Sequence, residues 1–443
     1  MKHFTQAHQD AQAAVLGNED LRRHLERVCL IWDLQGRLRI LLKLSERGDA
    51  GAVRDQAGRI LAGAAEPFWT GEIWLWSEKS SPAELAVYKQ AWAEGTMIDS
   101  GPPEVRVLER HVSKAVWFTP NIAEPWPLNE HTPPILSFYS FKGGVGRTTA
   151  LASLAVQLAR SGKRVAVIDL DLEAPGLGTI LPHGDGETAP HGVVDFLLEQ
   201  PIVPMAQLDF EDFYHVVDDR TIIRDGVPIT VVPAGHLDEY YLEKLARLDY
   251  EALHTLSLAG QHPSSPLVAL LEQVRRERKA EYFLLDARAG LHDLGGLALS
   301  GVSHLDVVFG LDSEQSWRGM EVVVRFLGKA RIERGQRQLD CAMILAMAPE
   351  PGREREEAVR RFLERSYEMF AESFYDEADA DPEEGWPLPD VSAADQPHYP
   401  VLLGFDPLVQ RYQHIRDVAE RFTQGDFRLF AEQVLERVGR TLT

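Results

Sequence analysis

Short apolar runs alternate with longer amphipathic segments through the part of the chain that follows residue 134. Each run has the length of one buried strand, and each amphipathic segment repeats its apolar positions with the period of a helix. The predicted strands are 135–140, 164–169, 213–217, 228–232, 282–285, 306–311 and 341–348, and the predicted helices are 148–162, 237–258, 264–279, 313–329 and 354–370. This alternation favours a mostly parallel, doubly wound α/β sheet.

The C-terminal part of the pattern predicts one more strand and two more helices. Residues 400–405 have the character of an edge strand, and 407–423 and 427–438 are predicted helices. The last helix carries both Glu436 and Arg437 on its polar face, so we expect it to dock on the domain rather than on a membrane. The segment 372–395 is acidic and contains prolines, which favours a loop or a disordered insert.

The pattern of residues 1–131 predicts a smaller, separate α+β domain. A helical pattern over 5–28 is followed by two strands that turn near Gln35 and Gly36, and further helices are predicted at 52–65 and 81–95. The domain is rich in tryptophan, which fits either core packing or a face that binds a partner protein. A proline-rich stretch, 120–134, is typical of a stiff linker, so the predicted boundary lies between this domain and 132–443.

Composition narrows the classes of protein that the chain can belong to. Its 443 residues suffice for two or three domains, and its formal net charge of −22 disfavours non-specific nucleic-acid binding, which needs a basic surface. Cys29 and Cys341 are too few for a metal cluster or a disulfide framework, and a reducing cytoplasm is the expected location. We expect no membrane span, because no segment reaches about 18 uninterrupted apolar residues, and no signal peptide, because the N-terminus lacks an apolar core.

The candidate chemistry begins directly after the predicted strand 135–140. The loop FKGGVGR holds three glycines, and a predicted helix opens at Thr148. Glycines allow backbone N–H groups to turn inward around an anion, and a helix N-terminus adds partial positive charge. Strand, glycine loop and helix therefore predict a phosphate cradle, in which the Thr148 hydroxyl would ligate Mg²⁺. The usual pattern GxxxxGK[ST] is modified, because Phe141 replaces its first glycine and Arg147 replaces its lysine.

Three carboxylates follow two of the predicted strands. Asp169 and Asp171 end the strand after the glycine loop's helix, and Asp286 ends the strand 282–285. Ligands of open α/β sheets bind beyond the carboxyl ends of the strands. A carboxylate, a threonine hydroxyl, phosphates and water match the preferences of Mg²⁺, so Thr148 and Asp286 are predicted to hold the ion.

The KGGxG core resembles the deviant P-loop of the ParA/MinD family of ATPases, and the resemblance extends over about 134–350. It implies ATP and Mg²⁺ as cofactors and a homodimer that sandwiches two nucleotides. Lys142 would be a signature lysine that reaches the partner's phosphates, and Asp171 would orient the attacking water. Asp169 would help to hold Mg²⁺ and its waters, so the implied metal site is Thr148, Asp169 and Asp286. Residues 173–177 would form a switch loop. The implied nucleotide-binding residues are Lys142, Gly143, Gly144, Val145, Gly146, Arg147, Thr148 and Thr149.

Several positions depart from that family's pattern. Arg147 is larger and planar where a P-loop lysine would be compact, which leaves open slow hydrolysis, binding without hydrolysis, or neither. Arg288 stands in the loop after Asp286, where it would contact phosphate, a partner chain or only solvent. Ala348 stands where relatives often carry an adenine-reading asparagine. A dinucleotide site is the competing interpretation, but its third glycine position holds Thr149, and such a site has no use for Lys142.

Two functional hypotheses follow from these features. The first is an Mg-ATP-dependent dimerisation switch that regulates a partner protein through the N-terminal domain. The second is a catalytically silent P-loop adaptor or scaffold in a bacterial signalling or phage-defence system. An ATPase assay with an Arg147→Lys control would separate the two hypotheses.

Overall fold

The computed structural model describes residues 2–46, 48–77, 80–118, 125–183, 186, 188–248, 266–334, 340–377, 385–412 and 414–441. It divides into two compact units, Met1–Val112 and Ser113–Thr443. The division falls closer to the N-terminus than the predicted boundary at 131, because the short helix α5 (Ala115–Phe118) packs on α13 (Asp293–Leu297) of the second unit. Parts of the predicted linker, of the helix 237–258 and of the acidic segment lie outside the described residues.

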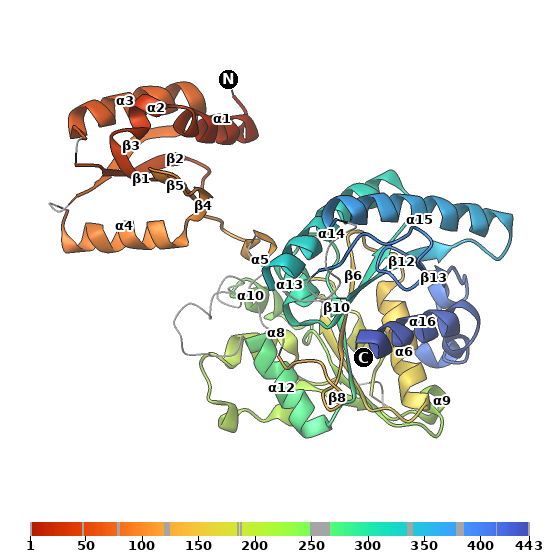
Figure 1. The fold of residues 1–443 in the computed structure, drawn as a ribbon. Coiled ribbons are helices and arrows are strands. Elements are labelled where there is room, and N and C mark those ends of the chain that lie inside the picture. Colours follow the sequence, from red (N-terminus) through yellow and green to blue (C-terminus); the bar gives the residue numbers. More distant parts are fainter. Residues whose placement is uncertain are drawn as a thin grey trace. The chain divides into compact units, whose positions relative to one another are not determined.

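The first unit is a five-stranded sheet in the order β3-β2-β1-β5-β4, with helices on both faces (Figure 1). Its strands are β1 (Leu25–Trp32), β2 (Leu38–Leu44), β3 (Trp69–Trp76), β4 (Thr96–Asp99) and β5 (Glu104–Glu109). Its helices are α1 (Phe4–Leu16), α2 (Glu19–Arg22), α3 (Ala50–Ala65) and α4 (Pro82–Glu94). Successive strand residues face opposite sides, so Val28, Leu30 and Leu42 pack under α1 and α3, while Cys29, Ile31 and Leu41 pack toward α4. The α+β prediction for this part of the chain is confirmed.

The predicted helix over 5–28 is wrong in its second half. The chain leaves α1 at Gly17 and starts the short α2, whose N-cap Asn18 accepts a hydrogen bond from the Leu21 N–H. Strand β1 then begins at Leu25. An asparagine cap favours a new helix start over a continued helix, and the sequence analysis did not use that signal.

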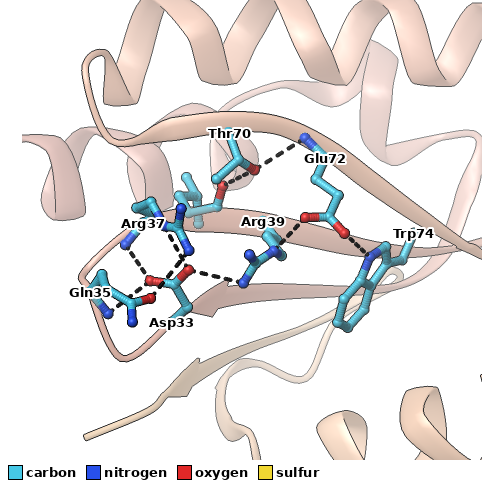
Figure 2. Close-up of polar contacts among 8 residues, drawn as sticks. Asp33, Gln35, Arg37, Arg39, Thr70, Glu72 and Trp74 are labelled. Atoms are coloured by element: carbon cyan, nitrogen blue, oxygen red, sulfur yellow. Dashed lines mark hydrogen bonds and ion pairs between the residues drawn. The ribbon is translucent and has the colours of Figure 1, made fainter. Parts of the chain in front are cut away.

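A polar network fixes the predicted turn at Gly36 and joins it to strand β3 (Figure 2). Gly36 has a φ of 72°, and the Asp33 carboxylate accepts the N–H groups of Gln35 (3.0 Å) and Arg37 (2.9 Å). Arg39 bridges Asp33 and Glu72, and Glu72 accepts the indole N–H of Trp74 (2.9 Å). These contacts cross the irregular register between β2 and β3, so side chains hold this edge strand where the ladder is interrupted.

The second unit contains an eight-stranded sheet in the order β13-β12-β11-β6-β10-β7-β9-β8. Every described pairing is parallel except that of β8 with β9, which confirms the mostly parallel sheet. The strands are β6 (Ile135–Ser140), β7 (Val165–Leu170), β8 (His215–Val217), β9 (Ile229–Val232), β10 (Tyr282–Ala287), β11 (Leu305–Gly310), β12 (Asp340–Ala348) and β13 (Val401–Gly404).

Helices cover both faces of this sheet, as a doubly wound fold requires. They are α6 (Arg147–Arg160), α7 (Leu177–Ile180), α8 (Val193–Glu199), α9 (Arg220–Ile223), α10 (Tyr241–Leu245), α12 (Pro266–Arg278), α13, α14 (Glu314–Arg334), α15 (Arg353–Ser373) and α16 (Gly425–Thr441). Short 3₁₀ or π turns are η1 (Met205–Gln207), η2 (Phe210–Phe213), η3 (Ala298–Val302), η4 (Val409–Arg411), η5 (Ile415–Asp417) and η6 (Arg421–Thr423). Helices α6 and α16 lie side by side (Figure 1).

The C-terminal predictions are correct in part. The last predicted helix is α16, and its Phe430, Val434 and Val438 are buried against the sheet, which confirms that it docks on the domain. The predicted helix over 407–423 is wrong, because the chain there forms the separate turns η4, η5 and η6. None of the described helices is long and apolar enough to cross a membrane.

Both cysteines are free and lie inside the two sheets. Cys29 is in β1 and Cys341 is in β12, and both are buried. Burial raises the pKa of the Cys29 thiol to about 12 and raises that of Cys341 well above its usual value.

Candidate functional site

The glycine loop connects β6 to α6 in the conformation that the sequence predicts. Gly144 and Gly146 have φ values of 74° and 84°, a backbone region that residues with a side chain rarely adopt. Gly146 is also the N-cap of α6, so the loop ends at the helix N-terminus. A Cβ atom at Gly143 or Gly144 would meet nothing within 4 Å, so the space in front of the loop is open. Loop amides and the end of a helix thus border open space, as an anion site requires.

A cavity of about 530 Å³ lies in front of this loop. Part of its lining comes from the glycine loop and from polar side chains, namely Gly143, Gly144, Gly146, Thr148, Thr149 and Asp171. Another part is apolar or aromatic, namely Met347, Leu403, Phe405, Val409, Tyr412 and Phe427. The lining therefore combines polar groups suited to phosphates with apolar side chains suited to a flat ring.

The apolar part of this lining was not predicted from the sequence. Phe405 was placed at the end of the predicted edge strand 400–405 and Tyr412 in the predicted helix 407–423, whereas both side chains line the cavity. The aromatic side chains that follow the last strand are the signal that could have identified this wall.

The predicted acids meet at the carboxyl ends of two neighbouring strands. Asp169 of β7 and Asp286 of β10 are direct partners in the sheet, and both are buried. The Thr148 hydroxyl donates to Asp286 Oδ2 at 2.7 Å. Burial is the main cause that raises the pKa of Asp286, and burial together with the charge of Asp286 raises the pKa of Asp169 to about 7. The site thus holds two neighbouring acids away from water, where burial disfavours their charged forms.

Asp169 differs from Asp286 in what its oxygens contact. Its Oδ1 accepts the Asp171 N–H at 3.1 Å, and its Oδ2 accepts the N–H groups of Gly176 (3.1 Å) and Leu177 (3.0 Å). Both oxygens therefore hold the backbone of the loop that follows β7. In this arrangement Asp169 organises the predicted switch loop, and Asp286 is the carboxylate that the Thr148 hydroxyl contacts.

Arg147 lies inside the site and pairs with two of the acids. Its Nε donates to Asp286 Oδ1 at 2.6 Å, and a terminal nitrogen donates to Asp171 Oδ2 at 3.0 Å. The other terminal nitrogen is 3.4 Å from the Ser140 hydroxyl, and the side chain is only 8% exposed. These carboxylates keep the pKa of Arg147 above its ordinary value although burial opposes this. Arg147 was predicted to bind the phosphates, and its pairing with two acids was not predicted.

Lys142 stands apart from these groups. It is partly exposed, it does not line the cavity, and its ammonium group makes no hydrogen bond or ion pair within the described part of the chain. The structure therefore brings Arg147, Thr148, Asp171 and Asp286 together and leaves Lys142 outside that cluster.

The predicted switch loop is tied to the loop that follows β10. Glu173 forms an ion pair with Arg288 at 2.6 Å and lies 3.0 Å from the imidazole of His292. The contact assigns Arg288 to Glu173 within its own chain. The next residue, Asp293, accepts the backbone N–H of Lys114 and the Lys114 ammonium group, and the His292 carbonyl accepts the indole N–H of Trp117 (3.0 Å).

The fold and the glycine loop define a P-loop nucleotide-binding domain, because a parallel sheet, an amide cradle at a helix N-terminus and a strand-end carboxylate beside a threonine occur together. The chain belongs to the family described as the CobQ/CobB/MinD/ParA nucleotide binding domain, whose model matches residues 136–359. The sequence-based recognition of a ParA/MinD-like chain with an additional N-terminal domain is thereby confirmed.

Individual relatives match only parts of this chain, at modest sequence identity. The chain is 35% identical over 158 residues to the chromosome-partitioning ATPase Soj of Thermus thermophilus, which covers 34% of this chain and 56% of Soj. It is 24% identical over 262 residues to the uncharacterized protein Rv1708 of Mycobacterium tuberculosis, over 58% of this chain and 70% of that protein.

Among solved structures, pNOB8 ParA has a TM-score of 0.42 at 16% identity, and MinD of Pyrococcus horikoshii complexed with Mg-ADP has a TM-score of 0.42 at 19% identity. Each of these two matches covers 70% of this chain and 99% of the other.

Proposed function

We propose that this protein binds Mg-ATP at the glycine loop and acts as a nucleotide-dependent dimerisation switch that regulates a partner protein. The observation that carries the proposal is the open amide cradle next to the Thr148–Asp286 pair, in the lining of a cavity of about 530 Å³. Membership of a nucleotide-binding family supports it.

The donor set fits a magnesium nucleotide. Asp171 Oδ1 is buried and has no hydrogen-bond partner among the described residues, so the site holds a carboxylate oxygen that needs a ligand. Within the described part of the chain, no three His, Cys, Asp or Glu side chains could hold a metal ion by themselves. Phosphate and water oxygens would complete the shell, as is usual for Mg²⁺.

Each residue has a distinct role in this proposal. The amides of Gly143, Gly144 and Gly146 bind the phosphates, and the oxygens of Thr148 and Asp286 hold the ion. A magnesium nucleotide supplies the phosphoanhydride bond and neutralises charge where it develops. Asp171 orients the attacking water once Arg147 releases it. The dimerisation contact comes from Lys142, whose ammonium group is available for a second copy.

A series of contacts within the second unit leads from the cavity to the residues that follow the N-terminal unit. Ala174, next to Glu173, lines the cavity. Glu173 contacts Arg288 and His292, and the adjoining Asp293 holds Lys114, two residues after the first unit ends. Rearrangement of the loop 173–177 around a nucleotide would therefore act on the first residues that follow the N-terminal unit. We assign the partner-binding role to that unit.

The test is the mass of the protein in solution with and without ATP and Mg²⁺, measured by light scattering. We expect ATP to convert the wild type to a dimer and Lys142→Ala to remain a monomer while it still binds the nucleotide. Lys163→Ala is the matched control, because the Lys163 ammonium group forms a surface ion pair with Glu281 and no other among the described residues. Unchanged ATP-dependent dimerisation of Lys142→Ala would contradict the proposed sandwich.

The second candidate function is a catalytically silent adaptor, and the specific observation in its favour is the position of Arg147. With both Asp171 and Asp286 held by one guanidinium group, the acids are not available for hydrolysis in this arrangement. Phosphate release by the wild type and by Arg147→Lys separates the two candidates. Activity that appears only in Arg147→Lys would identify the wild type as the silent form.

A further inference from the structure

The charges at the nucleotide site are unequal. Two carboxylates, those of Asp171 and Asp286, contact a single buried cation, Arg147, and Asp169 is the strand partner of Asp286. Both oxygens of Asp286 already accept a hydrogen bond, Oδ1 from Arg147 and Oδ2 from the Thr148 hydroxyl. Like charges that are this close and this buried repel one another strongly unless a cation lies between them. Arg147 is that cation in the nucleotide-free arrangement.

The shape of arginine makes this arrangement possible. Its guanidinium group presents donors in a planar fork and reaches acids on two different segments, one at the end of β10 and one after β7. A lysine ammonium group at the same position is a single point charge on a narrower stem. Arg147 therefore keeps the positive charge of the P-loop lysine that it replaces, but it contacts different groups.

The same oxygens are those that a divalent ion would use. An Mg²⁺ ion coordinated by Asp286 would use the two oxygens that now accept hydrogen bonds, and an ion that Thr148 also holds would lie close to the guanidinium charge. The cavity provides a destination for the displaced group, since the space in front of Gly143 and Gly144 is open. Arginine pairs with phosphate oxygens as well as with carboxylates.

We propose that Arg147 is a built-in counter-cation that competes with the divalent ion for Asp286, so that it must exchange the carboxylates for phosphate oxygens when nucleotide binds. Arg147 is a positioning residue in this scheme: it holds Asp171 and Asp286 together without ligand and releases them with ligand. The inference rests on the proposed nucleotide site and adds how that site is regulated. It follows that this chain depends less on divalent metal for nucleotide binding than a lysine-bearing form does.

The first experiment needs no nucleotide. Mn²⁺ is titrated into the purified full chain, and free Mn²⁺ is followed by electron paramagnetic resonance. We expect no stoichiometric Mn²⁺ site near the acids in the wild type and one new site in Arg147→Met. Because Met leaves buried acids without a cation, Arg147→Met combined with Asp171→Asn serves as a less charged second variant. Equal Mn²⁺ binding by the wild type and these variants overturns the inference.

The second experiment measures the ADP dissociation constant by calorimetry in Mg²⁺ and in EDTA. Loss of one charge-assisted contact changes a dissociation constant by about tenfold. We therefore expect the dissociation constant in EDTA, divided by that in Mg²⁺, to be about tenfold larger in Arg147→Lys than in the wild type. Arg160→Lys, on the same helix but paired with Glu420, is the control and should keep the wild-type ratio. An equal ratio in Arg147→Lys overturns the inference although nucleotide binds. If neither the wild type nor any variant binds ADP, the proposed function is overturned. In that case a new Mn²⁺ site in Arg147→Met would still support competition between Arg147 and the divalent ion for Asp286.

Discussion

Gly319 of α14 sets the position of the residue that opens the glycine loop. A Cβ atom at 319 would lie 1.9 Å from Cδ1 and 2.1 Å from Cγ of Phe141. Rotation of the ring about its own axis leaves Cγ in place, so Gly319→Ala must move the Phe141 side chain as a whole or the backbone beside it. Phe141 directly precedes Lys142 at the start of the glycine loop. We therefore expect this substitution, although it is far away in the sequence, to disturb the phosphate cradle.

The magnitude follows from two opposing terms. Overpacking of a dense core costs about 1–3 kcal/mol, and alanine gains about 1 kcal/mol over glycine inside a helix. The net loss of unfolding free energy should be about 1 kcal/mol, and the displaced loop should weaken ADP binding by about tenfold. Urea unfolding and calorimetry measure the two effects.

Two other glycines provide controls for this prediction. Gly439 of α16 has no atom within 4 Å of an added Cβ, so Gly439→Ala should stabilise the protein without changing ADP binding. Gly328 also lies in α14, and its added Cβ would meet the Ser373 carbonyl oxygen at 1.8 Å, so Gly328→Ala should destabilise the protein and leave ADP binding intact. If Gly319→Ala proves as stable as Gly439→Ala, or binds ADP like the wild type, the role given to Phe141 is wrong.

Three further predictions concern other parts of the second unit. Burial holds the pKa of His398 below its ordinary 6.5. The contribution of His398 to the free energy of unfolding is therefore complete above pH 6.5 and declines as the pH falls through the lowered pKa. Urea unfolding between pH 5 and about 7.5 should show a shallower decline of stability in His398→Gln than in the wild type. Phe430 is fully buried against both Phe138 and Phe309, so Phe430→Ala should cost about 3–5 kcal/mol in the same assay. Glu173→Gln removes an influence that raises the pKa of His292, so nuclear magnetic resonance titration should find that pKa lower still, and an unchanged value would contradict the ion pair.

Much of the fold of the second unit could be predicted, because its strands are buried on both faces and appear in the sequence as continuous apolar runs. The acids Asp169 and Asp286 could be placed at one edge of the sheet for the same reason, since parallel strands end together. The glycine loop was identified from its three glycines and its position between a strand and a helix.

What could not be predicted depends on contacts between residues that are far apart in the sequence. Arg147 and Asp286 are separated by 139 positions, and no local pattern indicates that the arginine turns to this acid rather than to phosphate. The amides that occupy both oxygens of Asp169 belong to the loop after its own strand, and their orientation depends on how that loop folds. The helical period of 407–423 was misleading for a similar reason, because its apolar residues belong to separate short turns, of which η5 packs on α9 and η6 packs on α6 and α16.

The two inward-facing thiols have a practical consequence for experiments on this molecule. Cys29 and Cys341 are shielded from solvent and resist ionisation, so maleimide reagents, which need an accessible thiolate, should leave the natural chain unmodified. One cysteine introduced on the surface of each unit would then carry a fluorophore pair without prior removal of native residues. Energy transfer between the dyes would report, in real time, whether the N-terminal unit changes its distance from the P-loop domain as ATP is added.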